Sequence, residues 1–190
     1  MTNYLRFAIV GLISPISWLA TGVHGQTQTT DAAAVVQSEK NASIDSDNRW
    51  IFQISPFTQH YSPSPEHKPV RLIGIERLNG NSKFWGGDQS LWGASYFSNS
   101  FGQPSGYVYY GGQYNDLFGQ ERLYFKWTAG VIYGYKPPYE NKVPFNRNGW
   151  SPGLIAGFGY KITPQWSVQV NALGAAAAML SFTYELPANK

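Results

Sequence analysis

The chain has no cysteine among its 190 residues. Disulfides, thiol nucleophiles and cysteine-ligated metal sites are therefore excluded, although this absence is neutral between cellular compartments. Charged residues are also scarce, at 13% against roughly 25% in ordinary soluble domains. A soluble β-sandwich would normally carry more surface charge to stay dispersed. The net charge of +3 is scattered without a basic stripe, so we expect no nucleic-acid partner.

Aromatic residues and glycine are plentiful instead. Aromatics make up 16% of the chain, which also has 20 glycines, 13 tyrosines and 7 tryptophans. The mean hydropathy is slightly negative, which argues against a bundle of membrane helices. Low charge, many aromatics and moderate hydrophobicity fit strands with one face in lipid and the other in a polar lumen.

The first 25 residues have the features of a cleavable signal peptide. Arg6 precedes an apolar stretch that is broken by Pro15, and small residues follow up to Gly25. The stretch is short for a membrane helix, so a retained anchor is the weaker alternative. Residues 26–49 are polar and predict a periplasmic leader, either flexible or forming a short amphipathic helix.

From Trp50 onward, short aromatic and β-branched runs alternate with Gly, Pro and Asn. Outer-membrane strands need about 9–11 residues of alternating polarity. Residues 50–187 therefore predict an all-β fold, an eight-stranded antiparallel outer-membrane β-barrel. The expected strands are 50–61, 70–79, 90–101, 107–117, 123–136, 151–162, 166–174 and 177–187.

The alternation is clearest in residues 123–136. One row there is aromatic and aliphatic, and it consists of Leu123, Phe125, Trp127, Ala129, Val131, Tyr133 and Tyr135. The opposite row includes Lys126, Thr128 and Gly130, and we assign rows of this small and polar kind to the lumen. Small lumen residues leave room for a ligand such as an acyl chain, or they merely permit barrel curvature and close strand approach. Both interpretations remain open.

The topology brings three polar side chains to one rim. With a periplasmic N-terminus, His60 ends the first strand, and Asn99 and Ser100 end the third strand, at the outer side. A histidine can take the serine proton while the oxygen attacks an ester, and amide donors can steady the oxyanion. The alternative is that the three residues only bond to loops and water.

The sequence gives little support for a metal site or a cofactor site. His60 and His67, with only Glu66 beside them, make a poor metal site. The chain carries no phosphate-binding loop, dinucleotide fingerprint or nucleophile elbow. We therefore expect neither a metal nor a soluble cofactor.

The rim residues occur in an order that resembles a known family. The stretch from Tyr96 to Gly111 resembles the catalytic third and fourth strands of the outer-membrane lipid A palmitoyltransferase (PagP) family. Residues 127–131 and 152–160 are similar to its fifth and sixth strands. The resemblance covers about residues 50–187.

This resemblance implies a tilted eight-stranded barrel that moves a palmitoyl chain from the sn-1 position of a phospholipid to lipid A. Its catalytic histidine, acid and serine fall on His60, Asn99 and Ser100. Its acyl-measuring glycine falls on Gly111, with Gly112 beside it. Pro69 and Pro152 resemble prolines that interrupt strand pairing and admit lipid sideways. The implied partners are phospholipid and lipid A, around a monomer in the bacterial outer membrane.

Asn99 is the main departure from the family, because an amide cannot offset the charge of an imidazolium. The first hypothesis is thus an acyltransferase with His60 as base, Ser100 as hydroxyl partner and Asn99 as orienter or oxyanion donor. The second is a non-catalytic small barrel that serves envelope integrity, adhesion or solute passage. The third is lipid A deacylation, with water as the acceptor.

Overall fold

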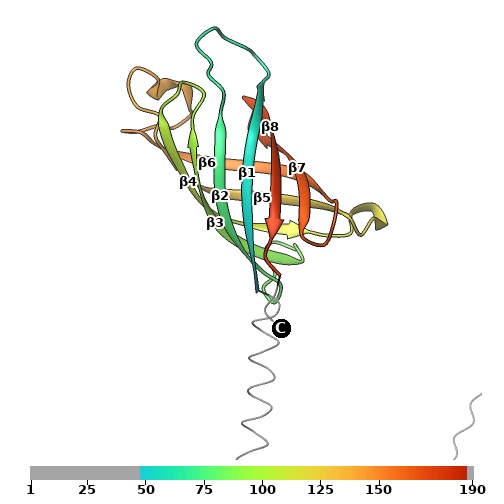
Figure 1. Ribbon diagram of the computed structural model, residues 1–190. Helices are drawn as coiled ribbons and strands as arrows, with labels where there is room; N and C mark the ends of the chain where they lie inside the picture. The colour runs from blue at the N-terminus through green and yellow to red at the C-terminus, as the bar shows by residue number, and fades with distance from the viewer. Residues whose placement is uncertain (1–47, 188–190) are drawn as a thin grey trace, which may run out of the picture.

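The computed structural model describes residues 48–187. Eight antiparallel strands pair in chain order, and β1 pairs with β8 to close the barrel (Figure 1). This confirms the predicted fold class. The strands are β1 (Asn48–His60), β2 (Arg71–Asn79), β3 (Gln89–Ser98), β4 (Pro104–Tyr114), β5 (Leu123–Tyr133), β6 (Trp150–Lys161), β7 (Trp166–Leu173) and β8 (Ala177–Glu185).

The predicted signal peptide, residues 1–25, and most of the predicted leader lie outside the described residues. The leader was expected to reach residue 49, but Asn48 and Arg49 already belong to β1. The described helical segments are two single 3₁₀ turns, Leu117–Gly119 and Glu140–Lys142. Within residues 48–187, no helix combines the length and the apolar character needed to cross a bilayer.

Both ends of the described chain lie at one end of the barrel, where β1 begins and β8 finishes (Figure 1). The loops 61–70, 99–103, 134–149 and 174–176 lie at the opposite end, which we call the rim. The long loop after β1 projects from this rim in Figure 1. His60 and Ser100 therefore belong to the same end of the molecule, as the topology predicted.

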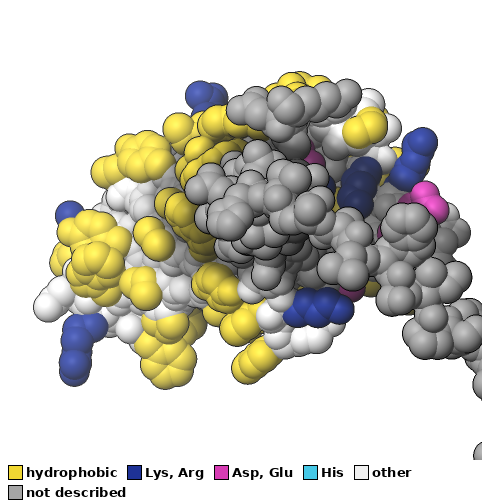
Figure 2. Space-filling model, turned by 90° about the horizontal axis from the view of Figure 1, so that it is seen from below, with side chains coloured by type: hydrophobic (Ala, Val, Ile, Leu, Met, Phe, Trp, Pro, Cys, Tyr) yellow, Lys and Arg dark blue, Asp and Glu magenta, His cyan; other side chains and the backbone are white. Residues whose placement is uncertain are grey.

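Side chains alternate across every strand between an apolar outer face and an inner face of mixed character. Val131 in β5, Leu154 in β6 and Val170 in β7 are exposed on the outside. Figure 2, seen from the end opposite the rim, shows hydrophobic side chains gathered on the uncovered part of the outline, with separate Lys and Arg side chains among them. Apolar rows outside and polar rows inside are the arrangement of outer-membrane barrels.

The middle of the lumen is filled by hydrogen-bonded polar side chains. Lys126 Nζ lies 2.9 Å and 3.0 Å from the two carboxylate oxygens of Glu76, and the Tyr109 hydroxyl donates to Glu76 at 2.9 Å. A second chain of bonds joins β1, β5, β7 and β8, and its members are Gln53, Tyr124, Gln169, Asn171 and Ser181. Small barrels are normally filled by their own side chains, and this lumen follows that rule.

A β-bulge in β1 decides which way His60 points. The pairing of β1 with β8 shifts between Ile54 and Phe57, so that one extra residue is accommodated near Pro56. Before the bulge Ser55 is buried, whereas after it Phe57 is exposed and pairs with Leu180. The extra residue changes the parity of the strand. As a result His60, opposite the buried Ala177, faces the inside of the barrel.

Candidate functional site

His60 and Ser100 meet at the rim. The His60 Nε2 atom lies 2.7 Å from the Ser100 Oγ atom, although 40 residues separate them in the sequence. β1 supplies the histidine, and the turn between β3 and β4 supplies the serine. Both residues are half-buried. This distance is within the reach that a general base needs for abstracting a hydroxyl proton.

Asn99 is completely buried, and its side chain is used to build the turn that carries Ser100. Its Oδ1 atom accepts hydrogen bonds from the backbone N–H groups of Phe101 and Gln103, each at 3.0 Å. Its Nδ2 atom donates to Ser105 Oγ at 3.1 Å and to Gln103 Oε1 at 3.4 Å. The structure thus brings His60 and Ser100 together, whereas the Asn99 side chain bonds to residues of its own turn and to Ser105 at the start of β4.

His67 is a member of this site that sequence reasoning considered only as a poor metal ligand. Its ring stacks on the His60 ring with a centroid distance of 4.1 Å and an interplanar angle of 31°. The other neighbour of His67 is Phe101, which stacks in turn on Tyr139 at 4.2 Å. A row of four rings therefore runs from His60 across the rim to the β5–β6 loop.

Tyr135 is another residue of this site that the sequence did not reveal. It was expected in the outer aromatic row of the fifth strand, but β5 ends at Tyr133 and Gly134 follows with a φ of 138°. The backbone leaves the strand there, which brings the Tyr135 hydroxyl close to the Ser100 side chain. Burial raises the pKa of the Tyr135 hydroxyl, and the neighbouring Ser100 hydroxyl opposes this shift. Tyr135 therefore remains protonated at neutral pH.

The two glycines that the resemblance assigned to an acyl pocket differ in position. A Cβ atom on Gly111 would lie 2.0 Å from the Trp127 backbone oxygen, so this glycine permits the close approach of β4 and β5. Gly112 lies beneath the β2–β3 turn, since its nearest neighbours are the Phe84 backbone oxygen and the Trp127 indole nitrogen. Phe84 itself stacks on the Trp127 ring at 5.5 Å.

Pro69 and Pro152 lie beside places where the strand ladder is incomplete. The pairing of β1 with β2 ends at Ser55 and Leu72, and Pro69 lies in the loop across from the remaining residues of β1. The pairing of β6 with β7 reaches only to Ala156, so that within the described chain residues 150–155 pair with β5 and not with β7. Pro152 is an exposed residue of this segment.

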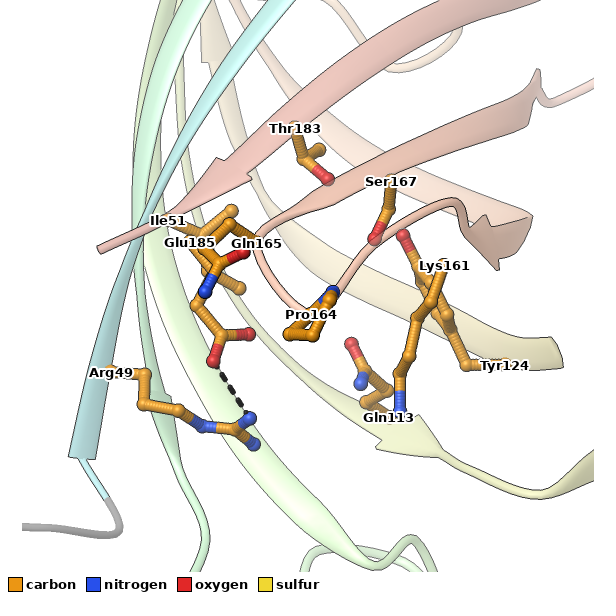
Figure 3. Close-up of a pocket in the computed structure, with 10 residues that line it drawn as sticks. All are labelled: Arg49, Ile51, Gln113, Tyr124, Lys161, Pro164, Gln165, Ser167, Thr183 and Glu185. Atoms are coloured by element: carbon orange, nitrogen blue, oxygen red, sulfur yellow. Dashed lines mark hydrogen bonds and ion pairs between the residues drawn. The ribbon is translucent and has the colours of Figure 1, made fainter. Parts of the chain in front are cut away.

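A small polar cavity of about 90 Å³ lies at the end opposite the rim (Figure 3). Gln113, Lys161 and Thr183 are among its lining residues, and Arg49 forms an ion pair with Glu185 at its edge at 2.9 Å. It is separated from His60 by the length of the barrel and takes no part in the rim site. Among residues 48–187, no group of three or more His, Cys, Asp or Glu side chains is arranged to hold a metal ion.

Comparisons with known proteins do not identify a family. No family model matches the chain, and no curated protein matches it. One matching solved structure is described as de novo design of transmembrane beta-barrels. It is 13% identical, with a TM-score of 0.49, and the match covers 74% of this chain and 96% of that one. The function must therefore be argued from the residues of the rim.

Proposed function

We propose that the protein is an outer-membrane acyltransferase that moves an acyl chain from a phospholipid to lipid A at the rim of the barrel. The single observation that carries the proposal is the 2.7 Å contact between His60 Nε2 and Ser100 Oγ. A histidine hydrogen-bonded to a hydroxyl is the minimal unit for activating a serine nucleophile.

The reaction runs in two balanced steps. His60 Nε2 takes the Ser100 hydroxyl proton while the Oγ atom attacks the ester carbonyl of the phospholipid. The ester bond then breaks, and the lysophospholipid oxygen leaves with the proton from His60. In the second step a lipid A hydroxyl gives its proton to His60 and attacks the acyl-serine, and Ser100 Oγ leaves as the hydroxyl. Each step returns His60 to its neutral form.

The apolar part of the lumen below the rim is where the acyl chain lies in this proposal. Phe97 lies near the rim end of β3, two residues before Asn99, and it packs with Ile132 and Ile155 against the same hydrophobic cluster. The Glu76–Lys126 ion pair, only 2% and 6% exposed at its side chains, forms a polar layer farther down. A hydrocarbon chain gains nothing from entering such a layer, so this ion pair limits its depth.

Lateral access at the two incomplete ladders supports a lipid substrate. Where β6 lacks β7 and β1 lacks β2, the wall is held by fewer backbone hydrogen bonds. Pro152 has no N–H to add to the ladder, and Pro69 is fixed in the loop beside the other interruption. We therefore place donor entry at one of these two sites.

The test uses the purified barrel in detergent with phospholipid and lipid A, followed by mass spectrometry of the lipids. We expect a lipid A that is heavier by one acyl chain, together with lysophospholipid. His60→Ala and Ser100→Ala should lower its formation by about 10²- to 10⁴-fold, the usual contribution of acid–base catalysis. A serine substitution outside the site, Ser90→Ala at the opposite end of β3, is the matched control and should keep activity.

Wild-type protein that forms no more product than the double variant His60→Ala/Ser100→Ala would contradict the proposal. Free fatty acid without heavier lipid A would instead identify a deacylase that uses the same two residues.

A non-catalytic barrel is the second candidate, and the filled lumen favours it. The Glu76–Lys126 layer and the chain of amides from Gln53 to Gln169 occupy the interior, which argues against a wide solute path. Such a barrel would serve adhesion or envelope integrity, and the rim residues would only order the loops.

A further inference from the structure

Two imidazole rings pack against each other at the rim with their planes inclined by 31°, and the hydrogen bond to the serine comes from only one of them. His60 and His67 stack at 4.1 Å, whereas the contact with Ser100 is made by His60 Nε2 alone. The second ring comes from the loop 61–70, which approaches from the side of β2.

The position of His67 is fixed by contacts on three sides. Its Nδ1 atom accepts a hydrogen bond from the Ser64 backbone N–H at 3.3 Å, and the His67 backbone N–H donates to the Ser64 carbonyl at 2.9 Å. The next residue, Lys68, donates its backbone N–H to the Ser100 carbonyl at 2.7 Å, which ties the loop to the serine turn. Phe101 meets the His67 ring edge-on at 5.6 Å. These contacts therefore hold His67 in a defined position at the rim.

A serine–histidine pair needs a third group that orients the imidazole. The family resemblance assigns this task to the position of Asn99, but both ends of that amide are occupied within the turn. The His67 ring packs against the His60 ring at 4.1 Å, and aromatic pairs have preferred geometries. It restricts rotation of His60 without a hydrogen bond.

We propose that His67 is the positioning residue of this site, in that its ring holds His60 Nε2 toward the Ser100 hydroxyl. The inference rests on the proposed acyl transfer for its role in a reaction, but the orientation of the ring can be measured by itself. Asn99 acts one step farther away, because its Oδ1 atom holds the Phe101 N–H and Phe101 packs against His67.

The experiment compares His67→Ala, which removes the ring, with His67→Phe, which keeps a flat stacking surface. The full-length barrel is labelled with ¹⁵N-histidine and studied in detergent micelles at about pH 8, where ordinary histidines are neutral. The ¹⁵N shifts report which His60 nitrogen carries the proton. We expect wild type and His67→Phe to keep a proton-free Nε2 that accepts from Ser100, and His67→Ala to show a mixture of the two tautomers.

Activity gives the second readout. In the lipid assay, His67→Ala should lower kcat by about tenfold or more with little change in KM, because a misplaced catalytic group lowers turnover. His67→Phe should restore most of it. The inference is overturned if His67→Ala leaves the His60 tautomer as in wild type, or if His67→Phe behaves like His67→Ala. If wild type transfers no acyl chain while the ¹⁵N shifts separate the variants as expected, the proposed function fails and the positioning of His60 stands.

Discussion

The middle of the lumen and the rim use polar residues in opposite ways. In the middle, Glu76, Lys126 and Tyr109 come from regular strands, are almost fully buried and satisfy one another. At the rim, His60 and Ser100 come from a bulged strand and a turn, and both are half-buried. The first group holds the wall together, whereas the second is partly exposed to solvent. Under the proposed function, stability and chemistry therefore lie at different levels of the same barrel.

The largest expected effect comes from deleting Pro56, which removes the extra residue of the β1 bulge. His60 would then point outward, and we expect acyl transfer to fall by about 10²- to 10⁴-fold. Pro56→Ala keeps the residue count and should retain most activity. Heat-dependent gel mobility checks that both variants form a barrel. A folded deletion variant with wild-type activity would show that the orientation of His60 does not matter.

Breaking the lumen layer should instead change stability. Lys126→Met leaves Glu76 buried without a partner, and we expect the free energy of unfolding to fall by about 3–5 kcal/mol in urea titrations from lipid vesicles. The paired variant Glu76→Leu/Lys126→Met should recover most of this loss. Acyl transfer by the folded protein should remain within a few-fold of wild type, because in the proposal the ion pair limits only the depth of the acyl chain. If Lys126→Met lost most of its activity but kept its stability, the lumen pair would serve the reaction and not the stability of the barrel.

Substitutions at Asn99 distinguish a turn-building role from a catalytic one. Asn99→Ala leaves the N–H groups of Phe101 and Gln103 without their acceptor, which should cost about 1–3 kcal/mol of stability and loosen Ser100. Asn99→Asp keeps the acceptor and loses the donation to Gln103 Oε1, whereas the Ser105 hydroxyl can turn to donate to the new carboxylate. We expect it to be no more active than wild type. Increased lipid A acylation in Asn99→Asp would indicate that an acid at this position reaches His60.

The smallest effect is expected at Tyr135. Tyr135→Phe removes the hydroxyl beside Ser100 but keeps the ring, so activity should fall by no more than about fivefold, equivalent to about 1 kcal/mol. Initial rates in the lipid assay measure this. A loss as large as that of Ser100→Ala would make the tyrosine hydroxyl a catalytic group.

The wall of the barrel was predictable from the sequence because side chains alternate with a period of two. Lys126 and Thr128 on one row and Val131 on the other were assigned to the correct faces. The topology was also enough to place His60 and Ser100 at one end, since both close strands that run in the same direction.

The details of the site were not predictable in the same way, because they depend on departures from regular pairing. The direction of His60 depends on one extra residue near Pro56, and only the proline itself hinted at it. Tyr135 continued the alternation of the fifth strand in the sequence, yet the backbone turned away at Gly134. His67 lies in a ten-residue loop without the alternation of a strand, so its packing on His60 could not be predicted from the sequence pattern.

Acyl transfer through Ser100 is tested most simply in a Gram-negative host that lacks its own lipid A acyltransferase. Lipid A is extracted from cells that express equal amounts of the wild-type barrel or of Ser100→Ala, and its mass is measured. We expect an additional lipid A species, heavier by one acyl chain, with wild type and its loss with Ser100→Ala. Identical lipid A profiles from the two strains would contradict it.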